Sequence, residues 1–141
     1  MINQDLKEAL NEKIEEGEFD VVDIPAYLTL FCELGNEIEE LQEEVEDWDR
    51  RVNFELAGAN VHCANAYWVI IENGRFSTGE GSLDEADLVL KLEAFHAAQI
   101  FAGDMDAKAA YMSGALKVQG ELPDAVKMQT LIEIVGEEIE Y

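Results

Sequence analysis

Two stretches near the N-terminus carry apolar residues at helical spacing. Within residues 5–16, Leu6, Leu10 and Ile14 lie four positions apart, which predicts a short amphipathic helix that Gly17 ends. A longer helix is predicted from residue 23, where Asp-Ile-Pro supplies a cap and a proline suited to the first turn. Its apolar positions alternate at intervals of 3 and 4 residues: Ile24, Tyr27, Phe31, Leu34, Ile38, Leu41, Val45 and Trp48.

The 3,4 spacing of this long stretch allows two interpretations. A heptad stripe is typical of a coiled coil, but Glu37, Glu44 and Asp49 flank it, so a parallel self-pair would bring like charges together. An apolar stripe with this spacing equally suits a helix that packs across a sheet. We therefore predict that the helix packs on the domain's own sheet, with a bend at Gly35, and that the protein is a monomer.

The middle of the chain changes to the alternation of period two that half-buried strands show. Asn73-Gly74 is a strong hairpin signal between two such strands. An apolar helical pattern follows at residues 95–102, and Gly103 ends it. The predicted strands are residues 52–56, 66–72, a return strand starting at 75–77, and 87–92, with a turn at 58–60 and a loop at 79–84.

Residues 103–131 hold three short elements with almost no linker. An alanine-rich helix at 106–112 ends at Ser113-Gly114. Residues 115–119 alternate, with Leu116 and Val118 on one face, as a strand requires. Gly120 ends that strand, and Pro123 suits the start of a final helix with a broad apolar face.

This central stretch resembles the sterol carrier protein family, the sterol-binding and lipid-transfer domain. The resemblance extends from about Ile24 to Glu137 and includes an upstream hairpin and strand, ENGRFSTGEGSLDEADLVLKL. The matching motifs are Gly103, Tyr111-Met112-Ser113-Gly114, Leu116-Lys117-Val118-Gln119-Gly120 and Ala125-Val126-Lys127-Met128.

Pattern and resemblance together predict an α+β fold. The expected architecture is a twisted sheet of about five strands with helices mainly on one face, and the resemblance adds an apolar tunnel between them. Residues 23–141 would form the sterol-carrier-like domain, and residues 1–22 an acidic helical appendage. This appendage either covers an exposed apolar edge or serves a function, docking a partner or gating the pocket.

Charge is the unusual feature of the composition. The 141 residues include 32 acidic and 9 basic side chains, a net charge of −23, and residues 1–50 alone carry −14. Such a field repels nucleic acid and anionic membranes. It is explained either by solvation in a saline cytoplasm or by a basic protein partner that binds the acidic N-terminal half. No apolar run approaches the roughly 18 residues of a membrane span, and the N-terminus does not resemble a signal peptide, so we expect a cytoplasmic protein without stable membrane insertion.

Catalytic motifs are not evident in the sequence. His62 and Cys63 are neighbours, whose side chains we expect to point to different sides of a strand or turn; His96 stands alone, and Cys32 and Cys63 lack metal-ligand spacing. The sequence contains no GxSxG, phosphate loop or metal-ligand cluster. We therefore expect neither enzymatic chemistry nor a cofactor or metal.

The resemblance implies that the apolar side chains of the last helices and of the sheet line a lipid site. The expected ligand is a fatty acid, an acyl ester or a sterol-like amphiphile. Two alternatives remain: a protein-interaction or regulatory module with a filled core, and an accessory domain that presents a hydrophobic substrate to an enzyme. The candidate lipid-binding residues are Phe54, Phe95, Ile100, Phe101, Met105, Tyr111, Met112, Met128, Leu131, Ile132 and Val135.

Overall fold

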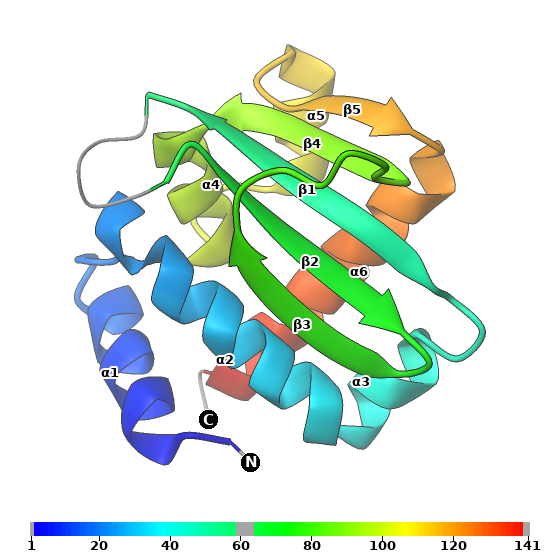
Figure 1. The fold of residues 1–141 in the computed structure, drawn as a ribbon. Coiled ribbons are helices and arrows are strands. Elements are labelled where there is room, and N and C mark those ends of the chain that lie inside the picture. The colour runs from blue at the N-terminus through cyan, green and yellow to red at the C-terminus, as the bar shows by residue number, and fades with distance from the viewer. Residues whose placement is uncertain (1, 59–63, 140–141) are drawn as a thin grey trace.

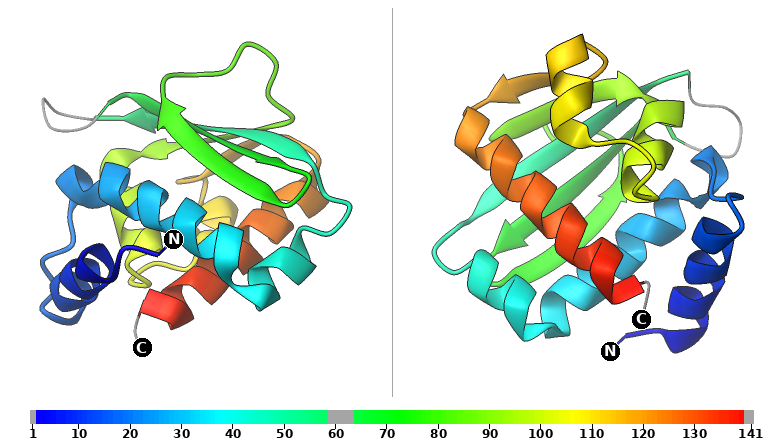
Figure 2. Two further views of the ribbon diagram at one scale, coloured as in Figure 1. Left: turned by 60° about the horizontal axis from the view of Figure 1, so that its bottom comes forward. Right: turned by 180° about the vertical axis from the view of Figure 1, so that it is seen from behind.

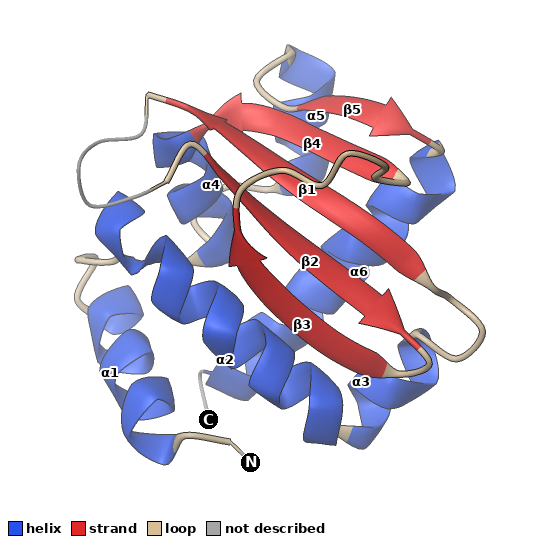
Figure 3. Ribbon diagram, in the orientation of Figure 1, coloured by secondary structure: helices blue, strands red, loops and turns tan. Residues whose placement is uncertain are grey.

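The computed structural model describes residues 2–58 and 64–139, and these residues form a five-stranded sheet covered by helices on one face (Figures 1 and 3). The spatial order of the strands is β3-β2-β1-β4-β5. The central pair β1 and β4 is parallel, and the other neighbouring pairs are antiparallel. The predicted α+β architecture is confirmed. The strands are β1 (Arg50–Ala57), β2 (Ala66–Glu72), β3 (Arg75–Glu80), β4 (Leu88–Glu93) and β5 (Lys117–Gly120).

The helices lie together on one side of the sheet, as the left view of Figure 2 shows. The connection from β3 to β4, residues 81–87, crosses the opposite face. The buried side chain of Asn53 holds this connection, because it accepts a hydrogen bond from Leu83 N at 2.9 Å and donates one to Leu83 O at 3.0 Å. The helical elements are α1 (Gln4–Glu15), the 3₁₀ turn η1 (Val21–Asp23), α2 (Ile24–Glu37), α3 (Glu39–Glu44), α4 (Ala94–Phe101), α5 (Ala107–Ser113) and α6 (Leu122–Ile139).

The prediction of one long helix reaching Trp48 is wrong, because the helix breaks at Ile38. Ile38 has extended backbone angles, φ −80° and ψ 123°, and separates α2 from α3. The side chain of Gln42 stabilises the junction, since its Nε2 donates to Gly35 O at 2.6 Å and to Gly74 O at 2.7 Å. The chain therefore turns at the hairpin end of the sheet, and Trp48 lies beyond α3, just before β1.

Gly35 serves a close approach between α2 and β3. A Cβ at this position would lie 2.4 Å from the ring of Phe76, so only glycine lets the helix pack this near the strand. The side chain of Asn36 accepts from Phe76 N at 2.7 Å and donates to Phe76 O at 3.0 Å. Because β3 is an edge strand, this pairing satisfies backbone groups that would otherwise be open to another chain.

Two further local predictions differ from the structure. The predicted loop at 79–84 starts too early, because β3 continues to Glu80 and the indole of Trp68 covers Gly79, where a Cβ would lie 2.5 Å from a ring atom. Asp23 makes no side-chain cap to α2; its carboxylate instead accepts from Asp20 N at 3.0 Å and from Lys13 Nζ at 2.7 Å. Part of the predicted 58–60 turn, together with His62 and Cys63, lies outside the described residues.

Helix α1 packs against the rest of the domain, beside α2 and the C-terminal end of α6 (Figure 2, right). Leu10 is 2% exposed, and Leu6 and Ile14 pack against the core. The buried Asp23 carboxylate pairs with Lys13 of α1. These contacts join α1 closely to the domain, and its independence as an appendage of residues 1–22 stays a prediction.

Candidate functional site

An apolar pocket of about 380 Å³, here called the main pocket, lies among β4, β5, α4, α5 and α6. Among its lining residues Lys108 alone is charged and Gln129 is the one amide, whereas the others are aliphatic, aromatic or alanine. The lining residues are Phe54, Leu90, Leu92, Ala97, Ile100, Phe101, Ala107, Lys108, Tyr111, Met112, Leu116, Val118, Leu122, Ala125, Val126, Met128, Gln129 and Ile132.

The alternating pattern of the strands builds the floor of the main pocket. Leu90 pairs directly with Val118 across β4 and β5, and both side chains line the pocket. Leu92 of β4 and Leu116, the residue just before β5, lie two positions further along and also line the pocket. The predicted alternation of Leu116 and Val118 therefore forms part of the pocket wall.

Helix α5 is a short element with a defined start and end. The Asp106 side chain caps it by accepting a hydrogen bond from Lys108 N at 3.2 Å, and Gly114 ends it at φ 87°, in the left-handed region that favours glycine. The two caps place Tyr111 and Met112, which belong to the motif that the sequence singled out, on the pocket wall.

Aromatic packing supports the inner wall. The ring of Phe101 stacks on Tyr27 at 4.3 Å between centroids and meets the edge of Phe54 at 5.9 Å. Tyr27 is fully buried, and burial raises the pKa of its phenol. Its hydroxyl finds no hydrogen-bond partner among the described residues, so the wall behind Phe101 is apolar apart from this one group.

The mouth of the main pocket is rimmed by exposed apolar side chains. Tyr111 and Met112 of α5 are 45% and 77% exposed, and Leu122 and Val126 of α6 are 49% and 55% exposed. Lys108 lies beside them on α5. Large apolar side chains gathered around an opening are typical of ligand-binding or contact surfaces.

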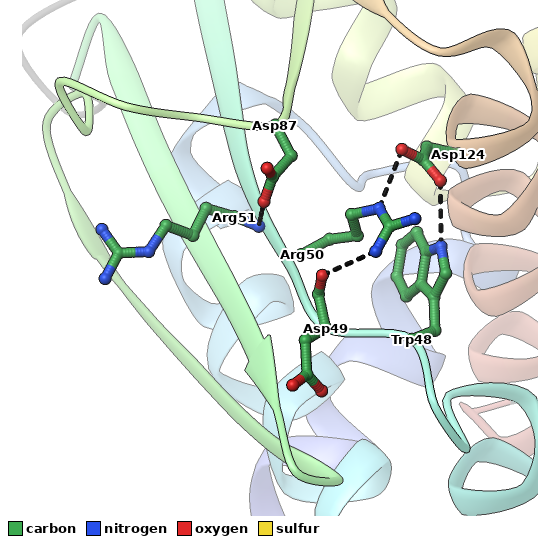
Figure 4. Close-up of polar contacts among 6 residues, drawn as sticks. All are labelled: Trp48, Asp49, Arg50, Arg51, Asp87 and Asp124. Atoms are coloured by element: carbon green, nitrogen blue, oxygen red, sulfur yellow. Dashed lines mark hydrogen bonds and ion pairs between the residues drawn. The ribbon is translucent and has the colours of Figure 1, made fainter.

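The start of α6 is held by a polar clamp formed by Trp48, Arg50 and Asp124 (Figure 4). The buried carboxylate of Asp124 accepts from Trp48 Nε1 at 3.0 Å and from Arg50 Nε at 2.9 Å, and the Arg50 guanidinium lies over the indole at 5.4 Å. Burial by itself would raise the pKa of Asp124, but the bonds from Arg50 and Trp48 and the charge of Arg50 outweigh it, so the pKa is lowered. The clamp fixes the first turn of α6, which carries Leu122, Ala125 and Val126 to the pocket.

Seven of the eleven candidate lipid-binding residues line the main pocket, although their role in binding stays a prediction. Phe95 lies outside it and is 57% exposed, while Met105 lines a neighbouring cavity. Leu131 and Val135 are fully buried in the core and line neither cavity, because α6 turns them away from the opening. The seven are Phe54, Ile100, Phe101, Tyr111, Met112, Met128 and Ile132.

Several lining residues were absent from the sequence-based set. Ala97, Ala107 and Ala125 line the pocket because their small side chains leave space, whereas a search for large apolar residues passes over alanine. Lys108 and Gln129 are polar and were missed for that reason. The usable signal was their helical register, since Lys108 is one turn before Tyr111-Met112 and Gln129 one turn after Ala125 and Val126.

A second cavity of about 420 Å³ adjoins the main pocket. The two share Ile100, Phe101, Ala107, Gln129 and Ile132 as wall residues. The second cavity continues toward the C-terminal half of α6 and ends at Ile14 of α1, and its remaining wall residues are Ala102, Gly103, Asp104, Met105, Asp106, Glu133, Gly136 and Glu137.

Neither metal chemistry nor a membrane span is supported by the part of the chain that is described. No group of three or more His, Cys, Asp or Glu side chains within residues 2–58 and 64–139 is arranged to hold a metal ion. Nδ1 of His96 lies 3.7 Å from Glu93 Oε2, and His96 does not line the main pocket. None of the described helices is long and apolar enough to cross a bilayer.

Comparison with known proteins identifies the family. Residues 28–133 match the family described as the SCP-2 sterol transfer family. The chain belongs to the SCP-2 sterol transfer family. The matched region contains every strand of the described residues and all the lining residues of the main pocket. A search among curated proteins found no match.

Solved structures agree with the SCP-2 fold. Sterol carrier protein 2 from Yarrowia lipolytica is 21% identical over 75% of this chain and 86% of its own, with a TM-score of 0.59. The sterol carrier protein domain 2 of Helicoverpa armigera is 18% identical over 85% of this chain and 91% of its own, with a TM-score of 0.62.

A longer protein contains the same fold. The inverting sec-alkylsulfatase Pisa1 from Pseudomonas sp. is 20% identical over 65% of this chain, with a TM-score of 0.52. This chain covers only 14% of the sulfatase. At these identities the likenesses show the fold alone.

Proposed function

We propose that this SCP-2 protein is a non-enzymatic carrier that holds a single-chain amphiphile, such as a fatty acid, in the main pocket. The observation that carries the proposal is an open apolar pocket with a single charged residue, Lys108, on its wall. Its volume of about 380 Å³ falls in the range of small-molecule pockets. An open pocket in this position argues against the alternative of a regulatory module with a filled core.

The free energy of burying an acyl chain is sufficient for carrier function. A chain of about sixteen carbons gains on the order of 12 kcal/mol at roughly 0.8 kcal/mol per methylene. Association and ordering offset part of this gain, which leaves an expected affinity between micromolar and nanomolar.

Lys108 suits the anionic head of such a ligand. Four of the other basic residues, Lys13, Arg50, Lys91 and Lys127, are paired with carboxylates. Lys108 has no ion pair with any described residue and lies beside the exposed apolar rim. A carboxylate bound there would meet an unpaired ammonium while its chain enters apolar surroundings.

The charge of the whole protein favours delivery to a protein rather than to an anionic membrane. With a net charge of −23 the molecule is repelled by anionic lipid surfaces, whereas a basic protein would be attracted to the acidic N-terminal half. We propose such a partner, a cytoplasmic location and a monomeric state. Packing of the apolar stripe of α2 and α3 inside the domain supports the monomer, because that stripe is no longer free to form a coiled coil.

Lipid binding is tested by displacing a fluorescent fatty acid from the purified protein and by native mass spectrometry for a co-purifying lipid. We expect binding at low micromolar concentration or tighter; absence of both signals would overturn the carrier proposal.

The placement of the head is tested with Lys108→Glu. This change should weaken binding of a fatty acid by about tenfold or more, but leave the fatty alcohol of equal length within about twofold of the parent protein. Lys117→Glu is the matched control, because Lys117 is exposed on β5 and does not line the main pocket. Equal losses of affinity for the fatty acid and the fatty alcohol, or equal losses in Lys108→Glu and Lys117→Glu, would contradict a carboxylate bound at Lys108.

An accessory role is the second candidate, since the fold also occurs within the much longer sec-alkylsulfatase. Here the domain would present its bound amphiphile to a separate enzyme. A bound lipid that exchanges faster with a basic protein partner than with vesicles would favour this role over free transport.

A further inference from the structure

The main pocket and the second cavity follow one another along α6. On α6 the main pocket is lined by residues from Leu122 to Ile132 and the second cavity by residues from Gln129 to Glu137, so the two overlap at Gln129 and Ile132. From Leu122 to Glu137 the helix makes 15 steps along its axis, or about 22 Å at 1.5 Å per residue. The partition between the two spaces, formed by their shared wall residues, therefore decides whether a ligand chain meets one short pocket or one long channel.

The side chain of Gln129 spans this partition. Its Nε2 donates to Asp106 Oδ1 at 3.3 Å and to Glu133 Oε1 at 3.1 Å. Asp106 is the cap of α5, so the amide reaches from α6 to the opposite wall. Gln129 is half-buried and is the one uncharged polar side chain shared by both cavities.

We infer that the Gln129 side chain forms a barrier, here called the bar, that limits the length of the acyl chain the main pocket accepts. This inference rests on the proposed carrier function. A chain that stops at the bar buries each methylene in apolar surroundings. A longer chain must displace the Gln129 amide from its two hydrogen bonds, which lie at exposed positions, and this loss offsets part of the burial of the first methylenes that pass. Affinity therefore rises with chain length up to the bar, and the next methylenes add little.

The far side of the bar favours one direction of entry. Beyond Gln129 the second cavity reaches Ile14 of α1, and its lining residues include four carboxylates and no basic residue: Asp104, Asp106, Glu133 and Glu137. An anionic head is repelled from this end, so the tail is the part that reaches the bar.

Gln129→Ala tests the inference with saturated fatty acids of roughly 10 to 20 carbons as displacers of a fluorescent fatty acid. In the parent protein each added methylene should tighten binding about fourfold until a limiting length. In Gln129→Ala the limit should move to longer acids by about two carbons or more, so the longest acids bind about tenfold tighter while short acids stay within about twofold.

Two more variants complete the design. Thr130→Ala is the control, because Thr130 neighbours Gln129 on α6 but lines neither cavity. Ile132→Trp adds volume at the shared wall and so narrows the passage between the two cavities. It should move the limiting chain length to shorter acids. If Gln129→Ala does not fold, Asp106→Ser keeps a hydroxyl cap for α5, removes the carboxylate that Gln129 contacts, and should likewise move the limit to longer acids.

The outcomes separate the inference from the proposed function. A parent protein that binds no fatty acid of any length contradicts the carrier function itself. If the parent protein binds fatty acids, and Gln129→Ala and Thr130→Ala show the same dependence of affinity on chain length as the parent, the inference about Gln129 is wrong. The carrier function is then still supported. A limit that moves in opposite directions for Gln129→Ala and Ile132→Trp supports the bar.

Discussion

The indole nitrogen of Trp48 lies 3.0 Å from a carboxylate oxygen of Asp124, a residue 76 positions later in the chain (Figure 4). Both residues are buried, and the second oxygen of Asp124 binds Arg50. The contact joins the segment between α3 and β1 to the first turn of α6. A pocket wall is thus fixed by a residue that does not touch the pocket.

Asp124→Ala is expected to destabilise the protein by about 1–3 kcal/mol, because it leaves the buried indole N–H of Trp48 without an acceptor. Chemical denaturation measures the change. The matched control is Lys127→Met, which removes the half-exposed pair of Lys127 with Glu44, again between α6 and α3, and should cost no more than about 1 kcal/mol. An equal loss in free energy of unfolding for the two variants would contradict the larger contribution expected of the buried Asp124 contact.

The same carboxylate should contribute to stability in a pH-dependent way. Its pKa in the folded protein is lowered below the unfolded value of about 3.9, so the charged form favours folding. That contribution is complete well above pH 4 and is lost as the pH falls through the folded pKa. The difference in free energy of unfolding between the parent protein and Asp124→Asn should therefore be constant near neutral pH and shrink below about pH 4. A difference in free energy of unfolding that stays constant down to about pH 2.5, more than one unit below the unfolded pKa of about 3.9, would contradict the lowered pKa.

Tyr27→Phe is expected to stabilise the protein. The Tyr27 ring packs on Phe101, and its hydroxyl is buried without a partner among the described residues, so the change keeps the ring and removes an unsatisfied polar group. The expected gain is about 1 kcal/mol, measured by urea denaturation. Tyr67→Phe is the comparison, because the Tyr67 hydroxyl accepts a hydrogen bond from Ala64 N at 2.9 Å and its loss should destabilise. A loss of stability in Tyr27→Phe would show that the hydroxyl is satisfied, for example by a buried water.

The sequence predicted which residues of the N-terminal half are buried better than it predicted the path of the backbone. Leu41, Val45 and Trp48 are all buried, as the 3,4 spacing required, although the helix breaks at Ile38. Apolar spacing reports the face that meets the core, and that face continues when a helix ends and a new one starts. The break depends on Gln42 binding the hairpin at Gly74, a contact 32 residues apart that no local pattern contains.

The candidate site was predictable to a similar extent. Tyr111, Met112 and the alternation of Leu116 with Val118 could be found from local motifs. Leu131 could not be separated from Ile132, because both lie on the broad apolar face of α6 and only the packed structure shows which of the two meets the opening. The helical register could place Gln129 on the pocket side of α6, but its hydrogen bond to Asp106, the N-cap of another helix, could not be predicted.

Helix α1 should contribute directly to stability. Leu10→Ala is expected to cost about 2–5 kcal/mol, since Leu10 is 2% exposed and packed against the core. The control Glu8→Ala, at an exposed position of the same helix, should change stability by less than about 0.5 kcal/mol. Deletion of residues 1–20 should likewise destabilise, because it removes both Leu10 and the Lys13 partner of the buried Asp23. A deletion that folds with parental stability would instead support an independent appendage.

The division of α6 into a pocket side and a core side leads to the last prediction. Ala125 lines the main pocket with a small, half-buried side chain, so Ala125→Trp should fill the pocket and abolish fatty-acid binding with little loss of stability. Leu131 is fully buried and lines neither cavity, so Leu131→Trp forces extra volume into a packed core and should cost about 1–3 kcal/mol or more.

Thermal denaturation and displacement of a fluorescent fatty acid, measured on both variants, distinguish the two sides. Leu131→Trp should have the lower melting temperature and should still bind the fatty acid at temperatures where it is folded. Ala125→Trp should melt near the parent protein and bind none. If Ala125→Trp instead binds as the parent does, the ligand lies elsewhere, because an indole in the main pocket leaves too little space for an acyl chain.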